Sequence, residues 1–206
     1  MAVTVLSPAE RDKLDRSDDS LFYAEPRFVH HLDASFRARL TQLYRERIPA
    51  CAVVVDLMSS WVSHLPEDIT YQEVIGHGLN GEELAANPRL DRHWLQNLNT
   101  TQQLPLADNS VDAVLIVAGW QYLQQPEAVA AELLRVVRPR GEVIVAFSNR
   151  MFFQKASQIW TDGSDREHLA YVAEVFTAQG WPTPQLVATP SRSTTTPTGP
   201  TAWGRG

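Results

Sequence analysis

The sequence predicts a single α/β domain with a doubly wound, mostly parallel sheet of six or seven strands and helices on both faces. Two observations support this fold class. Short apolar runs rich in β-branched residues alternate with longer stretches in which apolar residues recur at helical spacing. The chain has 206 residues, 44% hydrophobic and 20% charged, which is enough for one continuous core. In such a sheet, ligands bind beyond the carboxyl ends of the strands.

The first part of the chain predicts a helix followed by a buried strand. Residues 1–20 are polar and lack periodicity, so we expect a flexible start. Over residues 28–48 apolar side chains recur at helical spacing, with arginine and glutamate on the other face, which is typical of an amphipathic helix. Residues 50–55 are continuously apolar, as in a central strand covered on both faces, and this first strand stops at Asp56.

The next three elements give weaker signals. A second strand is predicted over residues 71–75, and a glycine-rich stretch follows it. A short helix over residues 82–86 comes next, limited by Pro88. Residues 94–98 are predicted as a third strand. Right-handed crossovers would place these strands side by side in one sheet.

The second half of the chain gives clearer signals. Residues 111–117 form a fourth apolar strand, and a helix with proline in its first turn begins at Pro126. A fifth strand is predicted over residues 142–147. Residues 164–180 start with a capping box of Ser and Glu and end at glycine, which predicts a helix. A sixth strand is expected over residues 185–188.

Composition narrows the range of partners. The formal net charge is -6, only two lysines occur, and the arginines are scattered, so no basic stripe suited to nucleic acid is present and a small molecule is the expected partner. No apolar run of about 18 residues occurs and the N-terminus soon becomes charged, so we expect no membrane span and a cytoplasmic protein. Cys51 has no cysteine or histidine partner at metal-ligand spacing, so we expect no metal and a buried, inert thiol.

The stretch LPLADNSVDAVLIVAGWQYLQQPEAVAAELLRVVRPRGEVIVAFSNR, residues 104–150, resembles the second half of class I methyltransferases of the type 11 group. The positions that match the family pattern are Leu104, Pro105, Asp108, Ser110, Asp112, Pro126, Glu127, Glu132, Arg135, Val136, Pro139 and Gly141. The runs DLMSSWVSHLP (residues 56–66) and SNRMFFQKASQIW (residues 148–160) also resemble a cyanobacterial and plant-plastid subgroup. The resemblance spans residues 22–188, which divides the chain into a flexible start (1–20), the domain (21–189) and an extended or disordered tail (190–206).

This resemblance implies a Rossmann-like fold and S-adenosylmethionine as cofactor. In the family, the first strand ends in an acidic residue, here Asp56, followed by a glycine-rich turn that lets the backbone approach the cofactor. The three glycine positions are here Met58, Ser60 and Val62. We expect Ser59 and Ser60 to cap a following helix while their N–H groups face the ligand carboxylate. Trp61 would stack on the cofactor or fill its place.

A second departure concerns the ribose. The family usually has an acidic residue at the end of the second strand, and the aligned residue here is Gly78; Asn80 or His77 could compensate. Asn97 would accept from the adenine amine. The expected cofactor-binding residues are Asp56, Ser59, Ser60, Gly76, Gly78, Leu79, Asn80, Asn97, Leu98, Ala118 and Gly119. Tyr122 or His64 could accept or relay a proton from an acceptor hydroxyl. Residues 28–48 and 151–160 are the expected lid.

Three alternatives remain open at this stage. The chain could be a non-catalytic domain that kept the fold and uses the former cofactor cleft as a binding surface. Gly76, Gly78 and Gly81 spell GxGxxG between a strand and a helix, the pattern of dinucleotide oxidoreductases, but on the second strand and without an acidic residue about 20 positions later. A hydrolase nucleophile at Ser59 or Ser60 would lack the GxSxG pattern.

Overall fold

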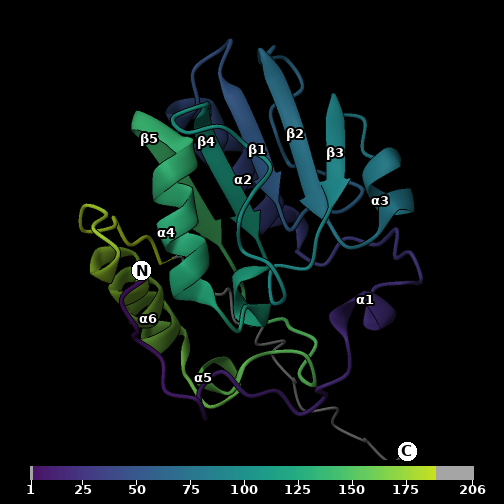
Figure 1. Cartoon of the computed structure of the whole chain (residues 1–206). Coiled ribbons are helices and arrows are strands. Elements are labelled where there is room, and N and C mark those ends of the chain that lie inside the picture. The colour runs from purple at the N-terminus through teal and green to yellow at the C-terminus, as the bar shows by residue number, and fades with distance from the viewer. Residues whose placement is uncertain (1, 189–206) are drawn as a thin grey trace, which may run out of the picture.

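The protein folds around one five-stranded, fully parallel sheet (Figure 1). The computed structural model describes residues 2–188, so the predicted tail over residues 190–206 lies outside the described residues. The strands, in the spatial order β3-β2-β1-β4-β5, are β1 (Val53–Leu57), β2 (Glu73–Gly78), β3 (Arg92–Leu95), β4 (Val111–Val117) and β5 (Val137–Ala146). The predicted fold class is confirmed. The sixth strand expected over residues 185–188 does not form, which leaves five strands in the described range rather than six or seven.

Helices cover both faces of this sheet (Figure 1). They are α1 (Asp19–Phe22), α2 (Ala34–Arg47), α3 (Gly81–Ala85), α4 (Pro126–Val136), α5 (Gln158–Thr161) and α6 (Asp165–Ala178), with a 3-10 turn at Trp120–Tyr122. α6 begins with the predicted capping box, in which Ser164 and Glu167 bond each other's backbone N–H groups. α2 starts later than predicted because Asp33 caps it by accepting from the N–H of Phe36.

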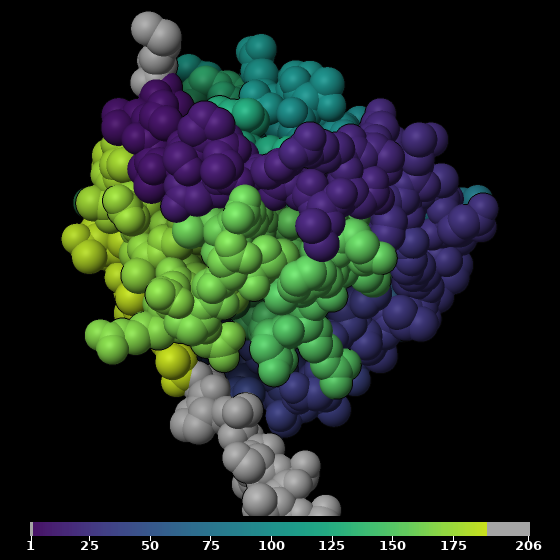
Figure 2. Space-filling model, turned by 90° about the horizontal axis from the view of Figure 1, so that it is seen from below, coloured from purple at the N-terminus to yellow at the C-terminus, as the bar shows by residue number. Residues whose placement is uncertain are grey.

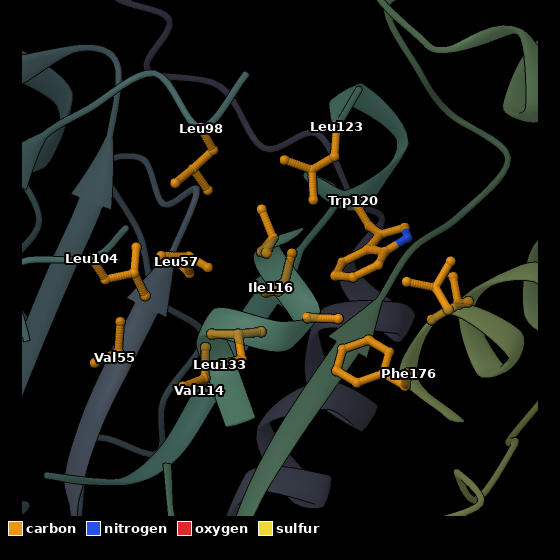
Figure 3. Close-up of a cluster of buried hydrophobic side chains, with 14 of the residues drawn as sticks. Val55, Leu57, Leu98, Leu104, Val114, Ile116, Trp120, Leu123, Leu133 and Phe176 are labelled. Atoms are coloured by element: carbon orange, nitrogen blue, oxygen red, sulfur yellow. The ribbon is translucent and has the colours of Figure 1, made fainter. Parts of the chain in front are cut away.

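Two apolar clusters hold the layers together. On one face, Val55, Leu57, Val114 and Ile116 of β1 and β4 point toward α4 and α6, as Figure 3 shows with Leu133 and Phe176. On the other face, α2 packs on Val54 and Leu115 through Leu40 and Tyr44. Ile48, the residue after α2, belongs to the same cluster. Full burial of one such large apolar side chain contributes roughly 1.5–3 kcal/mol, so these clusters fix the strands whose ends form the site.

No helix separates β1 from β2, which corrects one prediction. Residues 58–72 form turns and irregular structure, so Ser59 and Ser60 cap no following helix. Two physical reasons account for this. The hydroxyls of both serines bond nearby carboxylates instead of helix amides, and Pro66 disfavours helical backbone at the residue before it. The positive end of a helix dipole is therefore missing at this strand end.

Residues 2–33, which we name the N-terminal strap, cross the carboxyl ends of the strands. Figure 2 looks onto this end and shows the strap (purple) and the segment after β5 (green) covering it. Arg11 of the strap forms a 2.6 Å ion pair with the buried carboxylate of Glu127 in α4. Lys13 and Lys155 are both buried and form ion pairs with Asp19, at 2.8 and 3.4 Å. The first residues of the strap, which the sequence analysis predicts to be a flexible start outside the domain, therefore pack against the domain.

Two smaller observations complete the description. Cys51 is exposed and not buried as predicted, because it lies in the turn before β1 with φ 64°. Among residues 2–188, no helix has the length and apolar character needed to span a bilayer.

Candidate functional site

A cavity of about 370 Å³ lies at the carboxyl ends of β1, β2 and β4, within the usual range for small-molecule sites. All but one of the site residues predicted from the sequence line it: His64, Tyr122, Asp56, Ser59, Ser60, Gly78, Leu79, Asn80, Asn97, Leu98, Ala118 and Gly119. The exception is Gly76. A Cβ at Gly76 would lie 2.3 Å from Cδ1 of Leu90, so this glycine serves packing below the cavity.

The carboxylate of Asp56 holds the loop that follows β1 (residues 58–72, the β1 loop). Asp56 is buried and its Oδ2 accepts hydrogen bonds from the hydroxyls of Ser59, at 2.7 Å, and of Ser63. Burial raises the pKa of Asp56 to about 6, because the ionised form loses its hydration, while the two serine hydroxyls act in the opposite direction. Asp56 therefore organises this loop from within.

The first two backbone amides of the loop both donate to His77. The N–H of Met58 donates to Nδ1 of His77 at 3.1 Å, and the N–H of Ser59 donates to the His77 carbonyl at 2.6 Å. Nε2 of His77 lies 2.9 Å from the carbonyl of Gln96, which fixes the tautomer with the proton on Nε2. Burial lowers the pKa of His77 to about 4, so the ring is neutral near pH 7. Met58, at a family glycine position, still has left-handed backbone with φ 57°.

Glu83 of α3 is a site residue that the sequence analysis missed. Its carboxylate is buried in the cavity wall, where Oε2 accepts from the hydroxyl of Ser60 and Oε1 accepts from the N–H of Arg27 at 2.7 Å. Asn87 adds two 2.9 Å bonds from Nδ2, to the Ser60 carbonyl and the Ser63 hydroxyl. α3 and Asn87, which follows it, therefore hold the loop in place. The sequence signal that could have identified Glu83 is its place in the first turn of a helix that follows a strand end.

The end of β2 has no room for the usual acidic side chain. A Cβ at Gly78 would lie 2.7 Å from the carbonyl oxygen of Ser59. Asn80 uses all four of its side-chain hydrogen-bonding positions within the protein. Its Oδ1 accepts from two N–H groups at the start of α3, and its Nδ2 donates to the carbonyls of Tyr23 and Ala24 in the strap. Asn80 is a helix cap and an anchor of the strap, and neither it nor His77 has a polar atom free for a ribose hydroxyl.

The loop after β3 combines apolar and amide groups. Leu79 and Leu98 line the cavity from two sides of the β2 and β3 ends. Oδ1 of Asn97 accepts from the N–H of Asn99 at 3.0 Å. Nδ2 of Asn99 donates to Asp19, at 2.8 Å, and to the carbonyl of Tyr122, at 2.9 Å. Asn99, which the sequence analysis did not select for the site, therefore joins the strap to the turn after β4.

The two candidates for proton transfer differ in their state. Tyr122 is buried, its hydroxyl accepts from the N–H of Phe152 at 2.9 Å, and burial raises its pKa, so it is a neutral phenol. Burial lowers the pKa of His64 to about 4, which leaves a neutral imidazole near pH 7. A neutral imidazole can accept a proton, whereas a neutral phenol can donate one. His64 is therefore the better base of the two.

Trp61 lines the cavity and contacts the strap that covers it. Its Nε1 donates to the carbonyl of Val29 at 3.2 Å, and its ring centroid lies 4.8 Å from that of His30. Phe152, from the segment after β5, packs edge-on against His31 at 5.6 Å. The cavity is covered by the strap and residues 150–152. Of the predicted lid, only residues 29–32 and 151–152 line the cavity, whereas α2 packs on the sheet.

Comparison with known proteins finds a similarity for the central part of the chain. Residues 57–145 match the family model Methyltransf_11, described as a methyltransferase domain. This segment, less than half of the chain, is similar to type 11 methyltransferase domains. The matched segment runs from the end of β1 to β5 and so includes the strand ends that form most of the cavity floor.

Curated proteins match parts of this chain. A demethylmenaquinone methyltransferase of Renibacterium salmoninarum is 39% identical over 59 residues, which cover 29% of this chain and 25% of that protein. A malonyl-[acyl-carrier protein] O-methyltransferase of Hahella chejuensis is 25% identical over 169 residues, 78% of this chain and 60% of that protein. The match to the first of these relatives thus spans only about a quarter of its length.

Solved structures share the fold. A chain of the Haloferax volcanii complex that contains the Trm112 methyltransferase activator aligns with a TM-score of 0.51 and 16% identity, over 72% of this chain and 77% of that chain. The 4+2 cyclase SpnF aligns with a TM-score of 0.50 and 18% identity, over 69% of this chain and 57% of that chain. At such identities the likeness shows the fold alone, and the second example carries the name of a different reaction.

Proposed function

We propose that this chain is an S-adenosylmethionine-dependent methyltransferase that acts on a small molecule. The observation that carries the proposal is the cavity, because it brings nearly all family-derived positions together at the carboxyl ends of β1, β2 and β4. Met58, Trp61 and Val62, which replace or flank family glycines, line this cavity without filling it. Membership in the cyanobacterial and plastid subgroup stays a prediction.

The cavity residues fit the adenosine part of the cofactor. Leu79 and Leu98 would hold the adenine between apolar walls, with Asn97 at the amine edge. Glu83 is the acidic group in the wall near Gly78, and its carboxylate keeps acceptor positions beyond the two it uses. When bound, S-adenosylmethionine would supply a methyl group that is already activated by its sulfonium.

The chain's own contribution is then mainly position and enclosure. Ala118 and Gly119 leave the backbone after β4 close to the cavity, and a Cβ at Gly119 would lie 2.8 Å from the Cβ of Met58. The strap and residues 150–152 line the site and would limit the contact of a bound ligand with water. His64 would take up the proton of an acceptor hydroxyl, and Tyr122 would orient that acceptor.

Calorimetric titration with S-adenosylhomocysteine tests the proposal. We expect micromolar binding to the wild-type chain. Leu79→Arg, which places a charge in the adenine wall, should abolish this heat, whereas the matched control Leu95→Arg, at an exposed position of β3, should not. Wild-type protein that gives no heat at millimolar ligand would overturn the proposal.

A second candidate function is favoured by one observation. The amides of Met58 and Ser59 and the hydroxyls of Ser59 and Ser60 are all bonded within the protein, so a ligand carboxylate finds few donors there. This feature suits a non-catalytic domain that uses the cavity to bind another molecule. A folded wild-type chain that ignores S-adenosylhomocysteine, with an unchanged melting temperature in its presence, would favour this candidate.

A further inference from the structure

The cavity wall contains a cation that the functions considered so far do not use. Arg27 of the strap lines the cavity. Its Nη2 donates to the carbonyl of Phe22 at 2.8 Å, and its Nη1 is enclosed with no hydrogen-bond acceptor among residues 2–188. The ion pairs formed within this part of the chain do not include it. A guanidinium carries five N–H donors and a permanent charge, so most of its binding capacity is unused.

Aromatic rings hold this guanidinium in place. Its Cζ lies 4.7 Å from the ring centroid of Phe22, 5.5 Å from that of Phe152 and 5.8 Å from that of Tyr23. These distances are typical of cation–π contacts. The backbone N–H of Arg27 is fixed as well, by the 2.7 Å bond to Glu83. A charge that is positioned before the ligand arrives binds with less loss of conformational entropy.

The other charges around the cavity direct an anion toward this residue. The carboxylates of Asp56 in β1 and Glu83 in α3 accept from the hydroxyls of the β1 loop, so this loop is unfavourable for a further negative charge. Asp19 is already compensated by two buried lysines. Arg150, the other arginine of the wall, is exposed. The Arg27 guanidinium is therefore the enclosed cation of the cavity wall that forms no ion pair within residues 2–188, and the Glu83 carboxylate beside its backbone N–H already has two donors.

We propose that Arg27 binds a carboxylate of the ligand, an inference that rests on the proposed function. Bidentate geometry suits a guanidinium and a carboxylate. The carboxylate has two sources with the same chemistry: the amino-acid part of S-adenosylmethionine, or a carboxylate on the methyl acceptor. The first source would replace the donors that the β1 loop no longer offers.

Calorimetry on the full chain separates these sources. S-adenosylhomocysteine carries the carboxylate, and 5′-methylthioadenosine is the same thioether without the amino-acid part. Benzoate and benzamide form a second pair, titrated into protein with and without S-adenosylhomocysteine. The variants are Arg27→Gln, the conservative Arg27→Lys, and Arg39→Gln as a control at an exposed position of α2.

If the cofactor supplies the carboxylate, Arg27→Gln should weaken S-adenosylhomocysteine about 10- to 100-fold and leave 5′-methylthioadenosine unchanged. Arg27→Lys should recover part of this loss, and Arg39→Gln should lose nothing. If the acceptor supplies it, only benzoate binding should be lost.

The inference is overturned if Arg27→Gln changes neither pair, or weakens both members of a pair equally, since that pattern reports a structural role. If Arg27→Gln leaves S-adenosylhomocysteine binding unchanged and the protein does not prefer benzoate to benzamide, the Arg27 proposal is wrong and the methyltransferase proposal is unaffected. If benzoate binds in an Arg27-dependent manner and S-adenosylhomocysteine does not bind at all, the methyltransferase proposal is wrong and carboxylate binding by Arg27 is supported.

Discussion

Replacing Asp56 by asparagine should reverse a pH-dependent cost that the buried carboxylate imposes on the fold. The pKa of Asp56 is raised by burial from 3.8 to about 6. Between these two values the native state holds a proton that the unfolded state has released, so stability falls as the pH rises. A shift of about 2 units at 1.36 kcal/mol per unit corresponds to about 3 kcal/mol. The destabilisation develops between about pH 3 and pH 7, is fully present above this window and is absent below it.

Urea unfolding of both proteins at several pH values between 4 and 8 measures this effect. The free energy of unfolding of Asp56→Asn minus that of the wild type should rise by about 2 kcal/mol between pH 4 and pH 8, with most of the rise below pH 6. Any constant offset from the extra amide N–H does not change this rise. His77 and His64 titrate in both proteins and cancel. A flat difference would refute the reasoning, because it would mean that Asp56 ionises in the fold as readily as in the unfolded chain.

The remaining predictions concern groups around the same loop. Gly78→Asp, which restores the family's acidic residue, should destabilise the fold by roughly 1–3 kcal/mol because its Cβ would lie 2.7 Å from a carbonyl, whereas Gly81→Ala, with its nearest atom at 3.6 Å, should be nearly neutral in a thermal melt. Asn80→Ala should cost about 1–2 kcal/mol through the lost cap, and hydrogen exchange should rise selectively in the strap. His77→Phe should cost about 1–3 kcal/mol because it leaves the N–H of Met58 without its acceptor; unchanged stability in urea would contradict the assigned bond.

The fold was predictable because its signals are local and repeated. The strand over residues 111–117, the helix that begins at Pro126 and the capping box at Ser164 coincide with β4, α4 and α6. Boundaries were less accurate, since β1 runs on through Asp56 to Leu57 and β2 through Gly78. Apolar composition marks a strand's centre, whereas its last residues are decided by pairing with neighbours.

The sequence predicted positions that line the cavity, but it did not predict the bonds that their side chains form. Strand ends converge in a parallel sheet, which is why almost all predicted positions line the cavity. The contacts that occupy their polar groups come from residues far away in the chain. Arg27 contacts Glu83 across 56 positions, and Asn99 contacts Asp19 across 80. No spacing pattern encodes such pairings, because tertiary packing alone brings these side chains together.

The two departures from the family pattern have one structural cause. With His77 accepting from its first two amides, the β1 loop leans over the end of β2, where the Ser59 carbonyl takes the space that a side chain at position 78 would need. Glycine at position 78 is thus a requirement of the altered loop and no independent loss. It follows that restoring the acidic residue alone cannot restore the usual ribose contact. Only a variant that also returns glycine to the loop and removes the His77 ring would free both the amide of Met58 and the space, and its affinity for S-adenosylhomocysteine should exceed that of Gly78→Asp.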